Sequence, residues 1–98
     1  MIASFADGAT EDLYHGFRTR RSRRFPPDIV RTASRKLDLL EYAHVLHDLR
    51  IPPGNRLEAL RGSLSGYHSI RVNEQWRIVF QWRDGAAHNV AITDYHSG

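Results

Sequence analysis

Apolar residues along this chain follow two different repeats, a helical one in the first half and an alternating one in the second. Between Pro26 and Leu49 they recur every three or four residues, which is typical of a helix that buries one side. Prolines are well tolerated in the first turn of a helix, so Pro26 and Pro27 mark its start. The pattern predicts a helix that continues to Leu49 and is stopped by the Pro-Pro-Gly at residues 52–54.

A short strand and a short helix are predicted before it. The stretch IASF, residues 2–5, reads as a first strand. Asp7 or Thr10 is suited to cap a helix that runs to about His15, and Gly16 ends it.

Four later segments have the composition and alternation of strands, at residues 56–60, 67–72, 76–82 and 88–95. A glycine-bounded turn covers residues 62–66, and Asp84 with Gly85 predicts a tight hairpin. Helices first and hairpin-linked strands afterwards indicate the α+β class. We therefore expect a single domain, residues 1–98, with the N-terminal strand and the helices packed on one face of a small antiparallel sheet.

The clearest strand, residues 76–82, places an arginine near the middle of this sheet. Its large aromatic residues fall on one face, so Arg77 falls on the other, which we expect to be open to solvent. A two-residue turn pairs position 77 with position 92, and a turn longer by two residues pairs it with position 94. In both registers Asp94 shares the face of Arg77.

Composition excludes several classes of protein. A chain of 98 residues that is 41% hydrophobic makes one small folded domain. It has no cysteine, which excludes a disulfide framework and thiolate-bound zinc. No apolar run is long enough to cross a membrane and the start does not read as a secretory signal, so we expect a cytoplasmic protein. His44 and His47 share a helical face without a third ligand, so neither a metal nor another cofactor is expected.

Charge points to phosphate as a ligand. The net charge is +3, and all but one of the 14 basic residues are arginine, which binds phosphate in a bidentate manner. Five of them lie within FRTRRSRRF, residues 17–25: Arg18, Arg20, Arg21, Arg23 and Arg24. This arginine loop either follows a phosphate backbone or is merely solvated. We expect the flanking Phe17 and Phe25 to tie it to the core rather than to stack on a base.

The closing residues Asp94, Tyr95 and His96 bring together a carboxylate, a phenol and an imidazole. They are either an ordinary polar tail or a proton-transfer site. His96 is the natural proton shuttle, because the unperturbed pKa of histidine lies near 6.5. Tyr95 is suited to stack on an unpaired RNA base or to move a proton, and Asp94 to orient a neighbour.

The sequence as a whole resembles the HigB type of toxin (host inhibition of growth, or killer, proteins) in the RelE/ParE superfamily of bacterial toxin–antitoxin systems. The similarity covers nearly the whole chain, and SIRVNEQWRI and the closing DYH are its specific parts. It implies a small α+β protein that enters the ribosomal A site and cuts messenger RNA there without a metal. It also implies a HigA-like helix-turn-helix antitoxin, which holds the toxin inactive and is its only link to operator DNA.

The resemblance also implies roles for individual residues. The catalytic set would be Arg61, Arg77, Asp94, Tyr95 and His96. Contacts to RNA or the ribosome would come from Arg18, Arg20, Arg21, Arg23, Arg24, Arg71 and Asn73. Arg61 would contact the scissile phosphate, where relatives often have lysine, and Arg77 would stabilise phosphate charge. Because arginine does not lose its proton, the general base is left open among the tail residues and Glu58, which otherwise is a solvated strand residue.

Two other functions remain open from the sequence. A toxin of the ParE type would poison DNA gyrase by binding alone and would need no proton-transfer tail. A simple RNA-binding module would need only the arginine loop.

Overall fold

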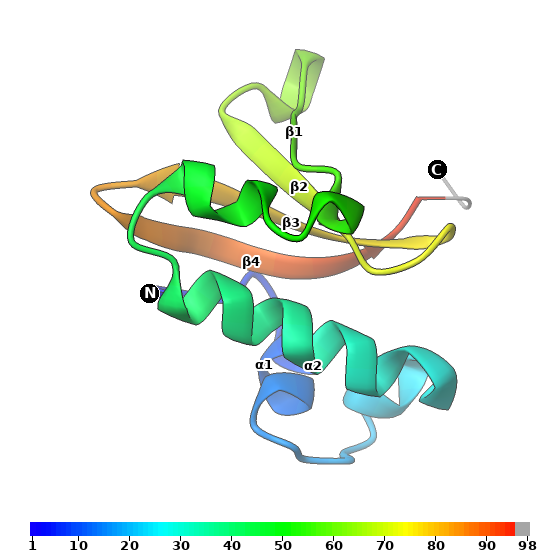
Figure 1. Ribbon diagram of the computed structural model, residues 1–98. Helices are drawn as coiled ribbons and strands as arrows, with labels where there is room; N and C mark the ends of the chain where they lie inside the picture. The colour runs from blue at the N-terminus through cyan, green and yellow to red at the C-terminus, as the bar shows by residue number, and fades with distance from the viewer. Residues whose placement is uncertain (96–98) are drawn as a thin grey trace.

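The computed structural model describes residues 1–95, which form a helical layer on a four-stranded sheet (Figure 1). The strands are β1 (Glu58–Ala59), β2 (Tyr67–Arg71), β3 (Trp76–Arg83) and β4 (Ala86–Asp94), paired antiparallel in the order β1-β2-β3-β4. Helices α1 (Gly8–Tyr14) and α2 (Pro27–Tyr42) lie against one face of the sheet. The predicted α+β class is therefore confirmed. No helix among residues 1–95 is long and apolar enough to span a membrane.

The starts of the helices follow the predicted signals, but α2 ends earlier than expected. Asp7 caps α1 by accepting a hydrogen bond from the backbone N–H of Thr10 at 2.7 Å. α2 ends at Tyr42, and the prediction of a helix to Leu49 is wrong. The carboxylate of Asp48 accepts the backbone N–H groups of His44 and Val45 at 2.9 and 3.2 Å, which favours a separate 3-10 helix over residues 46–50.

One edge of the sheet is partly covered, and the other is short. The predicted N-terminal strand is present only as two parallel bridges to the edge of β4, between Ile2 and Ala87 and between Phe5 and Val90. At the opposite edge, β1 contains two residues.

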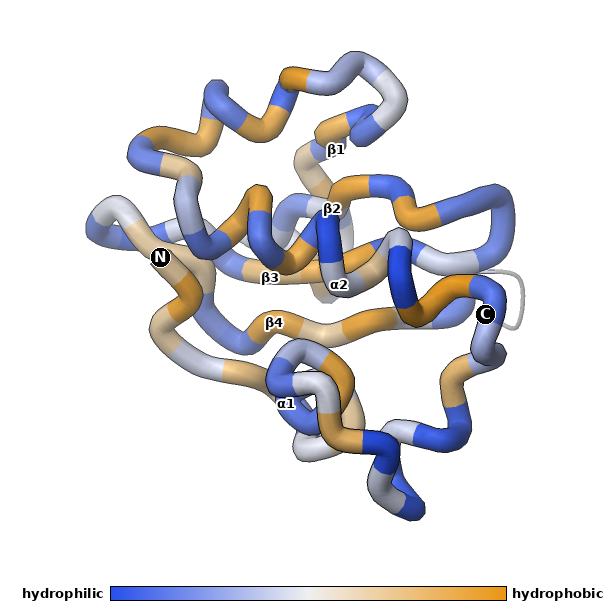
Figure 2. The backbone as a smooth tube through the Cα atoms, turned by 60° about the horizontal axis from the view of Figure 1, so that its bottom comes forward, coloured by the Kyte–Doolittle hydropathy of each residue, from blue (hydrophilic) through white to orange (hydrophobic). Residues whose placement is uncertain are grey.

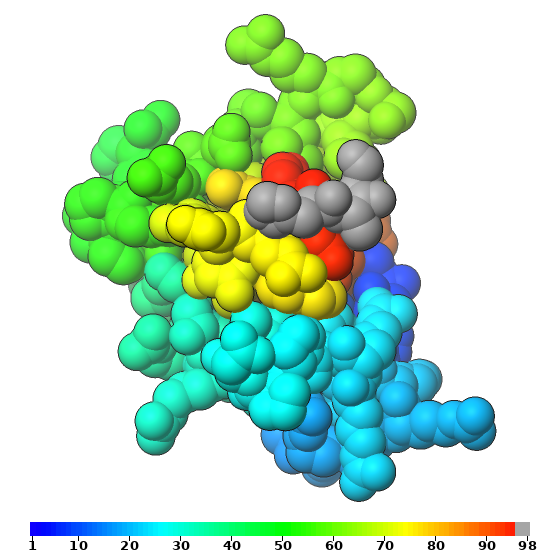
Figure 3. Space-filling view, turned by 90° about the vertical axis from the view of Figure 1, so that its right-hand side faces the viewer, coloured from blue at the N-terminus to red at the C-terminus, as the bar shows by residue number. Residues whose placement is uncertain are grey.

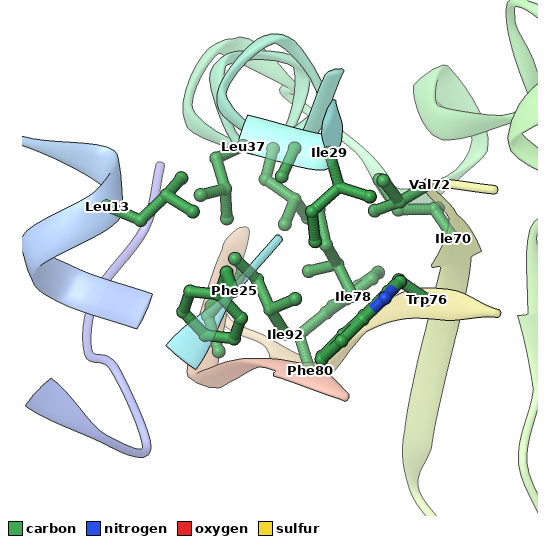
Figure 4. Close-up of a cluster of buried hydrophobic side chains, with 14 of the residues drawn as sticks. Leu13, Phe25, Ile29, Leu37, Ile70, Val72, Trp76, Ile78, Phe80 and Ile92 are labelled. Atoms are coloured by element: carbon green, nitrogen blue, oxygen red, sulfur yellow. The ribbon is translucent and has the colours of Figure 1, made fainter. Parts of the chain in front are cut away.

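The core lies between α2 and the helix-facing side of the sheet, and Figure 4 shows its side chains pointing toward one another from both layers. Hydrophobic positions recur along α2 and the strands (Figure 2). Phe25 is fully buried and meets Trp76 edge to face, with 5.7 Å between ring centroids. Phe25 thus ties the arginine loop to the core as expected, whereas Phe17 is 58% exposed and does not.

The β3–β4 hairpin has the predicted tight turn, with positive φ at both Asp84 (53°) and Gly85 (75°). Further along, a bulge between Val79 and Gln81 shifts the pairing by one residue. Asn89, with φ of 53°, is the residue of β4 that adopts the left-handed conformation there. Beyond the bulge every residue of β4 pairs one position away from a regular hairpin.

Candidate active site

The β4 bulge decides which residue of the tail faces Arg77. Arg77 pairs with Thr93 and Trp76 pairs with Asp94, so Asp94 lies on the side of Trp76. The expectation that Asp94 shares the face of Arg77 is therefore wrong. The next residue, Tyr95, returns to that face, and its ring centroid lies 5.5 Å from the guanidinium carbon of Arg77. Asp94 instead accepts a hydrogen bond from the side chain of Gln75 at 3.0 Å.

The end of β4 is also held against the loop between β2 and β3. The backbone N–H of Tyr95 donates to the carbonyl of Gln75 at 2.7 Å. Figure 3 shows this end of the molecule, with the β2–β3 loop in yellow beside the last described residues in red. His96 lies outside the described residues.

Arg77 is buried, with 8% of its surface exposed, and the prediction of a solvent-open position is wrong. Its Nε donates to the hydroxyl of Ser69 at 2.8 Å, and its Nη2 donates to the carbonyl of Arg56 at 2.7 Å. Nη2 also lies 3.0 Å from a carboxylate oxygen of Glu58. The chain before β1 and β1 itself thus cover a face that β3 alone would leave open.

These contacts fix the guanidinium of Arg77 and leave one side of it available. Nε and Nη2 are occupied, whereas Nη1 forms no hydrogen bond with any residue between 1 and 95. Arginine stays charged at every physiological pH, so Nη1 offers two oriented donors to an anion. The side chain of Glu58 is 54% exposed and lies against Nη2 rather than Nη1. The two donors of Nη1 are suited to bind a phosphate oxygen.

The structure brings some of the expected residues together and separates others. Arg71 is half-buried and pairs with Arg77 across β2 and β3, so the two arginines share a face. Asn73 instead shapes the β2–β3 turn, because its side-chain oxygen accepts the backbone N–H groups of Gln75 and Trp76 at 2.8 and 2.7 Å. Arg61 is exposed after β1, and within the described chain it forms no hydrogen bond or ion pair with Arg77 or with the groups that hold Arg77.

The arginine loop is not part of this site. Its first part lies on the far side of the helices from the sheet (Figure 1), whereas its last residue, Phe25, packs against Trp76. Arg21 pairs with Asp12 at 3.1 Å and Arg24 with Asp7 at 3.4 Å, so two of its five arginines hold the loop itself.

Ser69 was missed by the sequence analysis. It is fully buried and supplies the hydroxyl that orients Arg77. The available signal was its place two residues before Arg71 in an alternating strand, which puts a small polar side chain on the arginine face. No cluster of three or more metal-ligating side chains occurs within residues 1–95.

The arrangement of helices on a four-stranded sheet is shared with a solved structure. A chain of the YoeB–YefM complex from Staphylococcus aureus superposes with a TM-score of 0.60, covering 98% of each chain at 19% identity. This similarity shows the fold alone.

Sequence comparison gives the family. A family model described as "RelE-like toxin of type II toxin-antitoxin system HigB" matches residues 3–96. Toxin HigB-1 of Vibrio cholerae is 47% identical over 92 residues, which cover 94% of this chain and 95% of that protein. A protein of Proteus vulgaris named Endoribonuclease HigB is 44% identical over 41 residues, covering 42% of this chain and 45% of the relative. The chain belongs to the HigB-like toxin family, so it is a toxin of a type II toxin–antitoxin system and its partner is an antitoxin.

Proposed function

We propose that this toxin is a ribosome-dependent endoribonuclease that cuts messenger RNA in the ribosomal A site and so inhibits translation. The name of the Proteus vulgaris relative supports RNA cleavage as the activity. The observation that carries the proposal is the guanidinium of Arg77, fixed through Nε and Nη2 with Nη1 left for a phosphate.

The reaction uses a nucleophile that RNA already contains. The 2′-oxygen attacks the adjacent phosphorus, its proton passes to a base, and the bond from phosphorus to the 5′-oxygen breaks as that oxygen takes up a proton. The products are a 2′,3′-cyclic phosphate and a 5′-hydroxyl. The protein has to position these atoms, move two protons and offset phosphoryl charge, and no metal is needed.

Each residue of the site has a role that suits the chemistry of its side chain. Arg77 stabilises the charge that develops on the phosphoryl oxygens, because its donors are oriented before substrate binds. Tyr95 stacks on a base or moves a proton, and His96 is the proton shuttle. The carboxylate of Glu58, 3.0 Å from Arg77, is a second candidate base. Arg61 supplies charge to the scissile phosphate, and Asp94 positions the tail through Gln75.

The proposal includes the partners. The antitoxin is of the HigA-like helix-turn-helix type, and the toxin reaches operator DNA only through it. The target is the cytoplasmic ribosome with its message, to which the basic residues, Arg71 included, bind.

The test is cleavage of a defined message on translating ribosomes by purified toxin, with the new 5′ ends mapped. We expect cuts within A-site codons, a 5′-hydroxyl on the downstream fragment, and the same cuts in excess chelator. Arg77→Gln should abolish them. Arg83→Gln is the matched control, because Arg83 is an exposed arginine at the other end of β3.

Other outcomes would support a different function. Equal cleavage by the Arg77→Gln and Arg83→Gln proteins would show that Arg77 takes no part. Intact messages together with inhibition of DNA gyrase would favour the ParE type of activity, and binding without either effect would indicate an RNA-binding module.

A further inference from the structure

Asn55 is a fully buried polar residue in the segment that leads into β1. Residues 51–54 before it and Arg56 after it are exposed, so Asn55 is the point at which this segment enters the interior (green, before β1, in Figure 1). Its amide nitrogen donates to the carbonyl of Leu49 at 3.0 Å, and its amide oxygen accepts from the ammonium of Lys36. A buried amide that is bonded at both ends specifies one position for the backbone that carries it.

Both partners of Asn55 belong to the helical side of the protein. Leu49 is part of the hydrophobic core, and Lys36 lies half-buried on α2, next to the core residue Leu37. The ammonium group of lysine is a charged donor, which makes a stronger hydrogen bond than a neutral one. Asn55 therefore fixes the segment before β1 to parts of the fold that are already well packed.

The next residue along the chain carries the carbonyl that holds Arg77. This carbonyl, of Arg56, accepts a hydrogen bond from Nη2 of Arg77 at 2.7 Å. Arg56 adopts the left-handed conformation, with φ of 46°, which is uncommon for a residue other than glycine and persists only where the surrounding structure imposes it. Asn55 is the buried neighbour of Arg56, so the direction of the Arg56 carbonyl depends on it.

The bond to Arg56 determines how the guanidinium plane of Arg77 is turned. The bond from Nε to the Ser69 hydroxyl, at 2.8 Å, leaves the plane free to turn about the direction of that bond. The carbonyl of Ser69 is farther from Nη2, at 3.4 Å, and the carboxylate of Glu58 is 54% exposed, so water competes for it. Because the guanidinium is a rigid plane, the short bond to Arg56 fixes the direction in which Nη1 points.

We propose that Asn55 and Lys36 are positioning residues of the active site. Together they hold the carbonyl of Arg56, which turns Arg77 so that its Nη1 donors face the phosphate. This role rests on the proposed function, in which that phosphate belongs to RNA. Asn55 is fully buried and does not touch substrate, and the hydrogen bond of Lys36 is to Asn55.

Loss of Asn55 should slow the chemical step and leave ribosome binding unchanged. In Asn55→Ala the carbonyl of Arg56 is released, so Arg77 keeps its charge but loses its fixed direction. A misplacement of about 1 Å costs about a hundredfold in rate, so we expect cleavage at saturating toxin to fall about ten- to a hundredfold. The charge of the protein is the same, so the toxin concentration at half saturation should stay parental.

The first measurement is made on the free toxin and needs no substrate. Nitrogen-15 spectra of arginine side chains show separate Nη1 and Nη2 signals where rotation about the Cζ–Nε bond is slow, and one averaged signal where it is fast. The signals of Arg77 are those that disappear in Arg77→Lys. We expect them to be separate in the parent and averaged in Asn55→Ala. Lys36→Met removes one partner of Asn55 and should broaden them, so it decides the matter if Asn55→Ala does not fold.

The second measurement is single-turnover cleavage of ribosome-bound message over a range of toxin concentrations, with rates expressed per folded molecule. Ser22→Ala is the matched control. Ser22 is also a fully buried polar residue, and its hydroxyl donates to the carbonyl of Phe17 rather than to a group that holds Arg77. Ser22→Ala should lose stability but keep the Arg77 signals and the parental rate at saturation.

Three results would overturn the inference. The first is parental Arg77 signals in Asn55→Ala or, where that protein does not fold, in Lys36→Met. The second is averaged signals with a parental rate at saturation, because the direction of Nη1 would then not matter. The third is the same change of signals in Ser22→Ala, which would reflect a general loosening of the fold. A parental toxin that leaves messages intact would instead contradict the proposed function, and the nitrogen spectra would still decide whether Asn55 holds Arg77.

Discussion

Replacing Arg77 with lysine tests whether the shape of its guanidinium matters or only its charge. Lysine keeps the positive charge but has a single nitrogen with three donors in place of a planar fork with five. In the parent, Nε donates to the hydroxyl of Ser69, and Nη2 donates to the carbonyl of Arg56 and pairs with the carboxylate of Glu58. Nη1 is left for substrate. One ammonium group does not satisfy all of these positions.

These contacts determine how much stability and how much cleavage rate the lysine variant should lose. The Ser69 hydroxyl is fully buried and loses its charged donor, which should cost about 1–3 kcal/mol of unfolding free energy. In a domain of this size, each kcal/mol lowers the melting temperature by about 4–8 °C. Loss of oriented donors to the phosphoryl oxygens should lower the cleavage rate by about 10²–10³-fold.

Two measurements separate the effects. Urea unfolding of the free toxin gives the change in stability. Single-turnover cleavage of ribosome-bound message at saturating toxin gives the change in chemistry. Ser69→Ala serves as a companion variant, because it removes the same hydrogen bond and leaves the guanidinium in place.

A lysine variant that cleaves within a fewfold of the parental rate would refute the reasoning, since charge alone would then be sufficient. Parental stability in both the Arg77→Lys and the Ser69→Ala proteins would show that the buried hydrogen bond contributes nothing.

Further variants test the strand register, the tail and a half-buried histidine. Asn89→Ala should lower stability by about 1–2 kcal/mol in urea unfolding, because alanine disfavours the left-handed conformation, and Asn89→Gly should lose less. Ending the chain at Thr93 should leave a folded protein by circular dichroism but lower single-turnover cleavage by orders of magnitude, because the phenol and imidazole of the tail are lost. Burial lowers the pKa of His68 below its ordinary value of 6.5, so the folded protein binds fewer protons there than the unfolded chain. Its contribution to stability is complete above pH 6.5 and is lost as the pH falls toward the folded pKa, and His68→Phe should flatten this dependence in urea unfolding at several pH values.

Much of the fold was predictable because its signals are local. The hairpin at Asp84 and Gly85 needs two residues that tolerate positive φ, and both are adjacent in the sequence. The start of α2 at Pro27 and the aromatic face of β3 follow from composition and alternation over a few residues. Such features depend little on the rest of the chain.

The predictions were wrong where residues far apart in the sequence determine the structure. The register at Arg77 depends on a bulge at Asn89, and an asparagine in a strand was the available but weak sign of it. The burial of Arg77 depends on the carbonyl of Arg56, 21 positions away in the chain. The alternation of apolar and polar residues within β3 does not indicate which part of the chain covers the face on which Arg77 lies. The contact of Tyr95 rather than Asp94 with Arg77 was therefore not predictable from the tail itself.

The edges of the sheet bear on how the toxin behaves when it is released from its antitoxin. A long unpaired edge strand is a template for joining another molecule, and such joining leads to aggregation. Here two-residue β1 closes one edge, and residues 2–5 bridge the other at Ile2 and Phe5. At these positions a free toxin molecule thus offers little backbone to a second copy. We expect it to stay dispersed at the low concentrations at which one molecule must find a ribosome.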